Sequence, residues 1–425
     1  MVRKMEESMI KRDITSSFLR QSKTPTPNPS KNKNLPLITR VENFLNENFE
    51  FRRNLINEKL EYKKMKEQNS FWEQANENVI SRFLQKNYFN YSPNKTAELL
   101  NSDFVNEFNP FIEYFESLPA WDNNVEPYYI DKLKSLIKAK DQKRFNIQFR
   151  KMLIRCVACA TVRGNTNPNF NKHVFVLVNS NQSSGKSTLC RWLCPPALQE
   201  YYVENITFDK DGNIVLAQSF LINLDELATL KKHDIDQLKT FISKASVNER
   251  LPYGRLRKFY PRRANFIGST NNLQFLTDET GNVRWICSEI EEINFGYNDP
   301  KSEFYIPIDR LWAEAYSRFK AGEEWQLTTQ ELLENEIANQ TFKITCPEEE
   351  LLISYFEPAE KQKEFFVTNT DIMKKFAEKG CNINQLSQKK LGEVLRKLNF
   401  PRGEERRGNY PVKGYYLRDL PNLKS

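Results

Sequence analysis

The fold of this chain is indicated most strongly by one stretch, residues 173–190, HVFVLVNSNQSSGKSTLC. It opens with the apolar run 174–178, whose short length and β-branched residues indicate a buried strand rather than a helix. A polar segment follows, ends in Gly185-Lys186-Ser187-Thr188, and leads into a helical pattern. A strand, a polar loop, GK[ST] and a helix form the context in which such a loop binds phosphates. We therefore expect an α/β fold built around a phosphate-binding loop.

This loop offers the contacts that a nucleoside triphosphate needs. Backbone N–H groups of the loop and of the following helix start would face the phosphates. Lys186 is expected to reach the β- and γ-phosphates, and the Ser187 hydroxyl to ligate Mg²⁺. Ser180 replaces the first glycine of the GxxxxGK[ST] pattern and must adopt the turn itself. The predicted ATP-binding residues are Ser180, Asn181, Gln182, Ser183, Ser184, Gly185, Lys186, Ser187 and Thr188.

A second apolar run, residues 219–224, ends in the adjacent acids Asp225 and Glu226. Asp225 is expected to hold Mg²⁺, and Glu226 to orient and deprotonate the attacking water. An acidic pair after an apolar run is more often a solvated strand end. Its position after a phosphate-binding loop favours the catalytic interpretation.

A third buried strand is predicted at residues 264–269, and it ends in Thr270-Asn271-Asn272. A polar residue at the end of a strand beside the acidic strand can hydrogen-bond the γ-phosphate or the attacking water. Asn271 is the first candidate for this sensor role, and Asn272 the second.

Arg284 is the candidate for a residue that acts between subunits. An arginine here could project onto a neighbouring subunit's ATP and stabilise the charge that develops in phosphoryl transfer. A structural salt bridge is the alternative role for Arg284. Arg262 and Arg263 remain as reserve candidates.

The densest basic run lies at residues 250–258, with aromatic residues interleaved. Basic and aromatic residues together suit nucleic-acid contact. A charged, solvated hairpin is an equally good interpretation. The candidate DNA contacts are Arg250, Tyr253, Arg255, Arg257 and Lys258.

Towards the C-terminus, three short helical segments precede the glycine-punctuated basic stretch 402–418. Helices followed by a β-wing predict a winged-helix domain with 388–397 as its recognition helix. Winged helices also bind proteins, so that role stays open. The candidate phosphate contacts are Lys389, Lys390, Arg396, Lys397, Arg402, Arg406, Arg407 and Lys413.

The composition indicates the kind of partner that this protein binds and the compartment in which it acts. The net charge of +8 favours a polyanionic partner such as nucleic acid. Neither an apolar run of about 20 residues nor a secretory leader is found, so we expect a cytoplasmic protein without membrane association. Seven cysteines, an odd number, favour a reducing compartment. Packing cysteines are a better interpretation than a zinc site for Cys156, Cys159, Cys190 and Cys194.

A chain of 425 residues is expected to contain several domains. We predict a disordered basic tail at 1–40, a mainly helical N-terminal region at 41–165 that includes one small hairpin, an ATPase core at 166–345 and a winged helix at 346–425. Within the core, Asp211-Gly212 is expected to form a turn between two short strands.

Several segments, in this order, resemble virulence-associated protein E-like proteins of phages and other bacterial mobile elements. They are NSDFVNEFNPFIEYFESLPAWD, the phosphate-binding loop, FLINLDEL, RLPYGR, RRANFIGSTNN, FLTDETGNVRW and LWAEA. The resemblance covers residues 100–345 and implies an AAA+-like core similar to that of superfamily 3 helicases. Such proteins often accompany a primase, and the C-terminal region is similar to the winged helix appended to primase-helicases.

The resemblance also implies roles for individual residues. Lys186 and Ser187 would bind ATP and Mg²⁺, and Asp225 with Glu226 would form the Walker B pair. Asn271 would be sensor 1 and Arg284 the arginine finger. Two departures are Ser180 in the loop and Val283, where many relatives carry a second arginine. Because no primase signature is found, priming would need a separate primase chain.

Together these features predict an ATP-dependent DNA helicase that replicates a mobile element. It would assemble as a homo-oligomeric, hexameric ring on single-stranded or forked DNA, with ATP and Mg²⁺ bound between subunits. Two alternatives stay open. One is a non-translocating ATPase switch, such as a replication initiator or a defence protein. The other, a degenerate DNA-binding scaffold, is disfavoured by the presence of Lys186, Asp225 and Glu226.

Overall fold

The computed structural model describes residues 35–181, 184–225, 227, 232–252, 256–276, 282–344 and 346–420. The chain divides into two compact units, Met1–Phe108 and Asn109–Ser425. Most of the predicted basic tail lies outside the described residues. Its last residues belong to a helix, because α2 begins at Leu37.

In the described part of the first unit, residues 35–108, three helices pack against a small sheet. The helices are α2 (Leu37–Asn48), α3 (Glu77–Lys86) and α4 (Pro93–Leu100). The sheet has the order β3-β2-β1-β4, with β1 (Phe49–Asn54), β2 (Leu60–Lys64), β3 (Glu73–Gln74) and β4 (Asn106–Phe108). β1 and β2 form the expected hairpin, and β4 joins β1 in parallel. This unit therefore contains a sheet as well as the predicted helices, and it ends at Phe108 rather than near residue 165.

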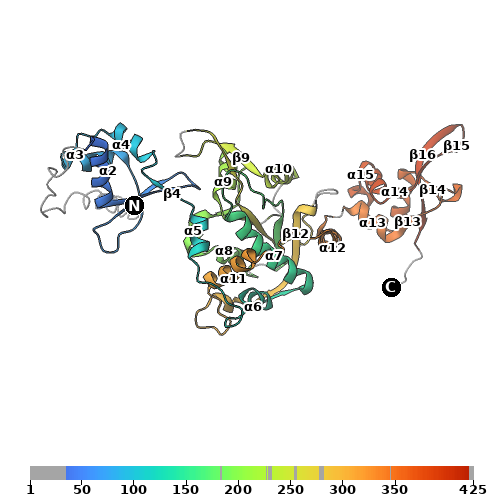
Figure 1. The fold of residues 1–425 in the computed structure, drawn as a ribbon. Helices are drawn as coiled ribbons and strands as arrows, with labels where there is room; N and C mark the ends of the chain where they lie inside the picture. Colours follow the sequence, from blue (N-terminus) through green and yellow to red (C-terminus); the bar gives the residue numbers. More distant parts are fainter. Residues whose placement is uncertain are drawn as a thin grey trace, which may run out of the picture. The chain divides into compact units, whose positions relative to one another are not determined.

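The second unit is organised around a six-stranded sheet of order β5-β12-β6-β11-β8-β7. Figure 1 labels β12 of this sheet, and the helices α5 (Pro110–Ser117), α7 (Gln142–Ala160), α8 (Lys186–Trp192) and α11 (Ile308–Lys320) of the same unit. Its strands are β5 (Ile137–Ala139), β6 (Val174–Val178), β7 (Tyr202–Glu204), β8 (Leu221–Leu224), β11 (Asn265–Thr270) and β12 (Trp285–Ile293). β5 pairs with β12 in antiparallel fashion, and the other five strands are parallel to one another, so their carboxyl ends meet at one edge. Ligands of open α/β sheets bind at this edge.

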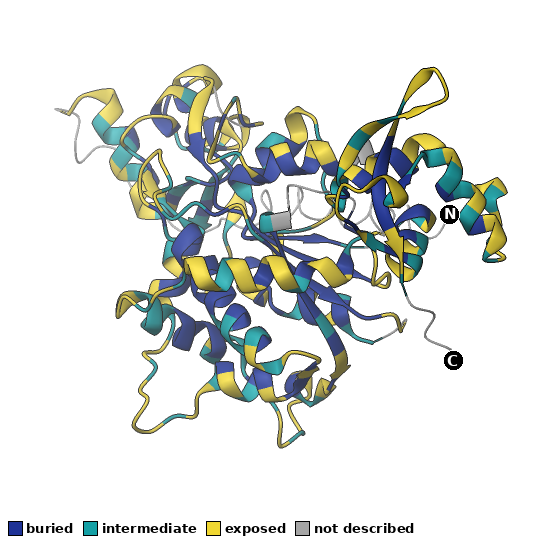
Figure 2. Cartoon of the chain, turned by 90° about the vertical axis from the view of Figure 1, so that its right-hand side faces the viewer, coloured by how far each residue is buried: buried dark blue, intermediate teal, exposed yellow. Residues whose placement is uncertain are grey.

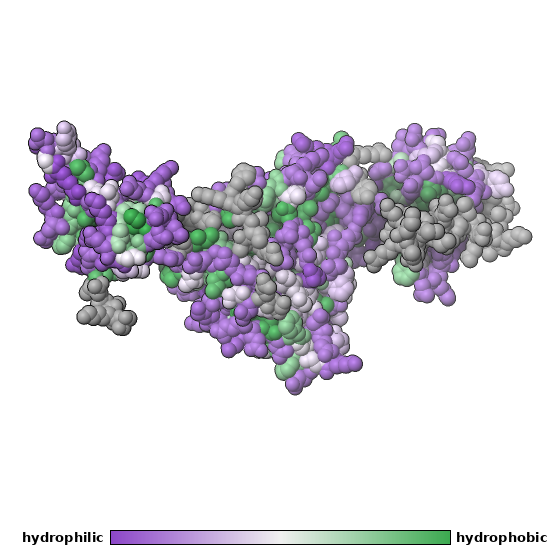
Figure 3. All heavy atoms as spheres, turned by 180° about the vertical axis from the view of Figure 1, so that it is seen from behind, coloured by the Kyte–Doolittle hydropathy of each residue, from purple (hydrophilic) through white to green (hydrophobic). Residues whose placement is uncertain are grey.

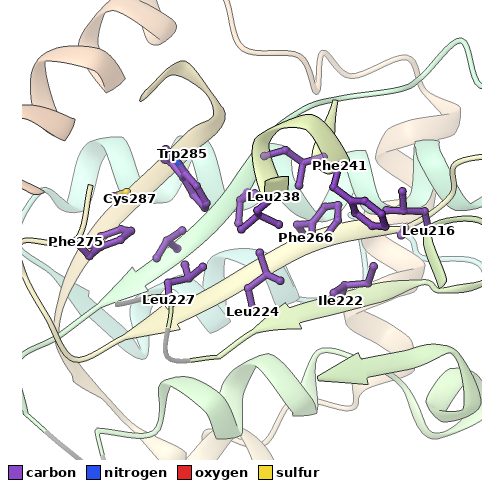
Figure 4. Packing of buried hydrophobic residues seen from close by; sticks show 14 of the residues in the cluster. Leu216, Ile222, Leu224, Leu227, Leu238, Phe241, Phe266, Phe275, Trp285 and Cys287 are labelled. Carbon is purple, nitrogen blue, oxygen red and sulfur yellow. The ribbon is translucent and has the colours of Figure 1, made fainter. Parts of the chain in front are cut away.

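The side chains of β6 alternate between the two faces of the sheet, and they are apolar and buried on both. Val174, Val176 and Val178 belong to a hydrophobic cluster with residues of α9 (Lys210–Gln218) and α10 (Lys232–Ile242). Figure 4 shows this cluster, including Leu216 from α9 and Leu238 from α10. Phe175 faces the other way and contacts the rings of Phe145 and Phe149. A strand with two apolar faces is expected where helices cover both sides.

The second face is covered by α7 (Gln142–Ala160), with α5 (Pro110–Ser117) and α11 (Ile308–Lys320) packed beside it. Phe115 and Trp312 meet edge to face at 6.0 Å, which joins α5 to α11. α7 contacts both β5 and β11, and β5 pairs with β12. Residues 109–165 therefore belong to the same unit as the sheet, although their helical pattern had placed them in a separate region. The remaining helices here are α6 (Tyr129–Ser135), α8 (Lys186–Trp192) and α12 (Thr329–Asn339).

The prediction of a turn at Asp211-Gly212 was wrong, because both residues lie in the first turn of α9. The Asp209 carboxylate caps this helix by accepting a hydrogen bond from the Gly212 backbone N–H at 3.0 Å. A Cβ atom at Gly212 would lie 1.9 Å from the Thr207 carbonyl oxygen. The glycine is thus needed for close packing at a helix start rather than for a turn.

The C-terminal segment has its own core. It contains α13 (Pro347–Tyr355), α14 (Asn369–Glu378) and α15 (Gln388–Lys397), with strands β13 (Phe356–Pro358), β14 (Phe366–Val367), β15 (Arg402–Arg407) and β16 (Tyr410–Asp419). Leu352, Phe376 and Leu395 are among the buried residues that join the helices to the strands. β15 and β16 form a long antiparallel hairpin. Thr368 and Asp371 make a capping box at the start of α14.

Burial follows this layered arrangement. Figure 2 shows buried residues on the strands of the sheet and exposed residues on the outer sides of many helices. On the face drawn in Figure 3, hydrophilic residues predominate and hydrophobic residues occur in small groups. In the part of the chain that the structure describes, no helix is long and apolar enough to cross a membrane.

Candidate active site

The loop after β6 brings Lys186 to the carboxyl edge of the sheet. Gly185 precedes α8 with φ +82°, a left-handed conformation that favours glycine. Lys186 opens the helix and is only 5% exposed. Its ammonium nitrogen donates to Ser184 Oγ at 2.7 Å and to the carbonyl oxygens of Asn179 and Asn181 at 3.2 and 3.3 Å. The loop therefore wraps around the ammonium.

Asn271 completes the surroundings of Lys186. It follows β11, the strand beside β6, and its Oδ1 accepts a hydrogen bond from Lys186 Nζ at 2.9 Å. Burial lowers the pKa of Lys186, while the Asp225 carboxylate partly opposes this shift. An anionic ligand at this position would stabilise the charged lysine. The structure thus brings together the predicted phosphate-binding lysine and the predicted sensor.

Ser187 and Asp225 also meet, as a metal-binding pair would require. The Ser187 hydroxyl donates to Asp225 Oδ1 at 3.0 Å and lies 3.3 Å from Ser269 Oγ. Ser269 donates a hydrogen bond to the same carboxylate oxygen. A hydroxyl and a carboxylate are the oxygen ligands that suit Mg²⁺, which binds through one or two carboxylates and substrate phosphates. The residues present therefore fit a Mg²⁺–triphosphate complex.

Some predicted site residues lie outside the described part of the chain. These are Gln182 and Ser183 of the loop, the acid Glu226, and the hairpin residues Tyr253 and Arg255. Ser180, Asn181 and Thr188 are exposed along the loop and the start of α8. Asn272 is exposed and accepts a hydrogen bond from the Gln274 backbone N–H.

Sequence reasoning missed Ser269 and Asn179. Ser269 lies two positions before Asn271, and residues two apart on a strand share a face, so the strand period could have identified it. Asn179 is buried, and its Oδ1 accepts a hydrogen bond from the Asn181 backbone N–H at 2.7 Å. It shapes the turn where the usual loop glycine is replaced by Ser180.

Arg284 lies at the opposite edge of the sheet. It closes the short 3-10 helix Asn282–Arg284, and the next residue, Trp285, pairs in register with Val174 at the amino end of β6. The loop of Lys186 follows the other end of this five-residue strand, about 16 Å away. Arg284 Nε donates to Ser243 Oγ at 3.2 Å. Arg284 therefore lies away from Lys186 and Ser187 of its own chain.

The reserve candidates Arg262 and Arg263 are also near the amino edge, and both are buried. Arg262 Nε donates to the Ala264 carbonyl at 3.1 Å, and its guanidinium lies over the rings of Phe170 and Phe266. Burial lowers the pKa of each arginine to about 10. These contacts hold the Arg262 side chain inside the unit.

The basic run 250–258 connects β9 (Ser246–Glu249) to β10 (Lys258–Pro261), which pair as an antiparallel hairpin. Leu251 and Tyr260 anchor its base in the hydrophobic cluster of the sheet. Arg250, Arg257 and Lys258 are exposed, and Arg257 lies 3.6 Å from the Glu249 carboxylate.

The basic residues of the C-terminal segment separate into two groups. Lys397 and Arg407 are ion-paired, with Glu349 at 2.7 Å and Asp371 at 2.6 Å. Arg407 holds the pKa of Asp371 at about 2. The other candidates, all exposed, are Lys389, Lys390, Arg396, Arg402, Arg406 and Lys413. Four of these, Lys389, Arg396, Arg402 and Lys413, line a cleft of about 710 Å³ between α14, α15 and the hairpin.

Cys156, Cys159, Cys190 and Cys194 are free and buried. Among the described residues, no three His, Cys, Asp or Glu side chains gather where they would hold a metal by themselves. The four cysteines pack within the unit, and their burial supports their interpretation as core residues.

Comparisons with known proteins place this geometry in context. A search of curated proteins found no match. The apo structure of the NrS-1 C-terminal region, residues 305–718, is similar at 14% identity and a TM-score of 0.47, covering 89% of this chain and 98% of that one. The A-form apo structure of that region gives 14% identity and a TM-score of 0.45, covering 92% and 100%.

The profile of the virulence-associated protein E-like domain matches residues 116–344, which is more than half of the chain. The match spans the loop of Lys186, the strand that precedes Asp225 and the strand that precedes Asn271. This chain therefore belongs to the virulence-associated protein E-like family.

Proposed function

We propose that this protein is an ATP-driven DNA helicase that acts in the replication of a phage or another mobile element. The observation that carries the proposal is the grouping of Lys186, Asn271, Ser187 and Asp225 at the carboxyl edge of the sheet. These side chains provide a cation and a sensor for the γ-phosphate, and oxygen ligands for a metal. In P-loop ATPases these are the groups that position and stabilise a transferring phosphoryl group.

Each residue then has a distinct task. Lys186 would exchange its loop partners for oxygens of the β- and γ-phosphates. Asn271, already beside the ammonium, would hydrogen-bond the γ-phosphate or the attacking water. Ser187 and Asp225 would hold Mg²⁺, which neutralises charge on the phosphates when bound. Glu226, the next residue in sequence, is our proposed base for that water.

A homo-oligomeric, hexameric ring is part of the proposal, because Arg284 lies at the edge of the sheet opposite its own nucleotide loop. A neighbouring subunit could place this edge against the ATP of the next one. Arg284 would leave Ser243 and stabilise the charge of the transition state in trans. The proposed ring has an AAA+-like, superfamily 3 helicase-like core in each subunit.

For DNA we propose two surfaces. The hairpin of β9 and β10 would grip the backbone of single-stranded or forked DNA through Arg250, Arg257 and Lys258. The C-terminal segment, with three helices and a long hairpin, would act as a winged helix that binds DNA through its exposed lysines and arginines. A separate primase is the partner we propose for priming.

A strand-displacement assay on forked DNA tests this function. The protein with ATP and Mg²⁺ should separate the strands, whereas Lys186→Ala should bind DNA without separating them. ATP hydrolysis and DNA binding without strand separation by the unmodified protein would contradict the helicase and favour an ATPase switch in replication initiation or defence.

A further inference from the structure

A phenylalanine ring covers the glycine of the phosphate-binding loop. Phe295 begins the 3-10 helix η5 (Phe295–Asn298), directly after β12 and Asn294. A Cβ atom at Gly185 would lie 2.3 and 2.4 Å from two carbon atoms of the Phe295 ring. The ring therefore rests directly on the backbone of the loop. Only a residue without a side chain leaves room for it.

The turn that carries Phe295 is fixed to the helix that carries Lys186. Tyr297, two residues further on, is fully buried and meets Trp192 of α8 edge to face at 4.6 Å. The Asn294 side chain caps the turn by accepting a hydrogen bond from the Gly296 backbone N–H at 2.9 Å. Phe295 itself is 49% exposed. A well-anchored turn thus presents half of an apolar ring to solvent beside a polar loop.

The order of the strands indicates which end of a nucleotide would meet this ring. Lys186 contacts Asn271 at the end of β11, and Ser187 contacts Asp225 at the end of β8. Both strands lie on one side of β6, so the γ-phosphate and the metal belong on that side. β12, and with it η5, lies on the other side of β6. A triphosphate whose γ end points to β11 directs its ribose and base towards η5.

The geometry points to Phe295 as the residue that stacks on the base of the bound nucleotide. This inference rests on the proposed ATP site and adds a contact for the part of the ligand that the loop does not hold. Every nucleobase has a π face, so a stacking ring contributes affinity without strong discrimination between bases. Phe295 should therefore support ATP and GTP alike.

Equilibrium binding of ATP, GTP and inorganic tripolyphosphate, each with Mg²⁺, separates stacking from phosphate contact. Phe295→Ala should weaken ATP and GTP binding about tenfold, within the range for the loss of one stacked base. Phe295→Leu keeps an apolar side chain against Gly185 but removes the π face, so it should show the same loss. Phe295→Trp should bind ATP as tightly as the unmodified protein.

Tripolyphosphate has no base, and its binding should be unchanged in all three variants, which also shows that the loop remains folded. Phe71→Ala is a matched control, because it removes a ring that is 78% exposed in the first unit. Its affinity for ATP should not change.

Two results would overturn the inference. ATP binding by Phe295→Ala at full strength would show that the ring does not contact the base. An equal loss of ATP and tripolyphosphate binding in Phe295→Ala and Phe295→Leu would show that the ring only packs the loop. If the unmodified protein binds neither ATP nor tripolyphosphate, the proposed ATP site itself is wrong. That outcome can be distinguished from the two results above, in which the unmodified protein binds both ligands.

Discussion

The ammonium of Lys186 and the amide oxygen of Asn271 lie 2.9 Å apart, although 85 positions separate these residues in the sequence. The contact forms because β6 and β11 are parallel neighbours, so the loop after one strand meets the residue after the other. In the described structure this lysine is held by polar partners of its own chain. A phosphate that binds here would contact the Lys186 ammonium and the Asn271 side chain, which already lie next to each other.

Asn271→Ala should lower kcat for ATP hydrolysis about a hundredfold, similar to the loss of one transition-state hydrogen-bond donor in other enzymes. The affinity for ATP should change little, because Lys186 remains. Asn272→Ala is the matched control, since Asn272 is the adjacent exposed asparagine and bonds the Gln274 backbone instead. Equal losses in the two variants, measured by steady-state phosphate release, would contradict the sensor assignment.

Ser269→Ala should raise the Mg²⁺ concentration needed for half-maximal hydrolysis about tenfold, as expected when a residue that orients a metal ligand is lost. Ser269 donates to the Asp225 carboxylate, and Ser269→Thr, which keeps the hydroxyl, should restore the original Mg²⁺ dependence. Ser288→Ala serves as a control in β12, because the buried Ser288 hydroxyl has no hydrogen-bond partner among the residues that the structure describes. An unchanged Mg²⁺ titration for Ser269→Ala would show that the hydroxyl does not support the metal site.

Arg284→Ala should reduce hydrolysis about a thousandfold while ATP binding is retained, because arginine fingers act on the transition state. Mixing this variant with Lys186→Ala subunits should restore activity, since each supplies what the other lacks. Ser243→Ala removes the partner that Arg284 has in its own chain and should leave hydrolysis intact. If Ser243→Ala reproduces the loss and mixing restores nothing, Arg284 is structural.

Binding of double-stranded DNA should depend on Lys389 and Arg396 but not on Lys397. The first two are exposed and line the C-terminal cleft, whereas Lys397 is paired with Glu349. Each of Lys389→Ala and Arg396→Ala should reduce the slope of log affinity against log salt by about one. Lys397→Ala should leave that slope unchanged. A full-size change in slope for Lys397→Ala would show that its ion pair opens on DNA.

The strands, the loop and most of the polar grouping could be predicted from local patterns. The run 174–178 is buried along its whole length, and the residues that follow three successive runs of this kind meet at one edge. The meeting of these residues is predictable because parallel strands bring their carboxyl ends together whatever the length of the connection between them. Lys186, Ser187, Asp225 and Asn271 are all found this way.

Long-range pairing was not predictable from the same patterns. β5 has only three residues, and nothing in the sequence indicates that it joins β12. The ion pairs of Lys397 and Arg407 likewise depend on acids 48 and 36 residues away. Phe295 follows an apolar strand as one more hydrophobic residue, and only the packing of η5 places it on Gly185.

Calorimetric titration of the folded protein with ATP and Mg²⁺ tests the central claim most directly. We predict saturable binding by the unmodified protein and hydrolysis that is lost in Lys186→Ala, with the thermal unfolding of that variant unchanged. Absence of nucleotide binding by the well-folded protein, or full hydrolysis by Lys186→Ala, would contradict it.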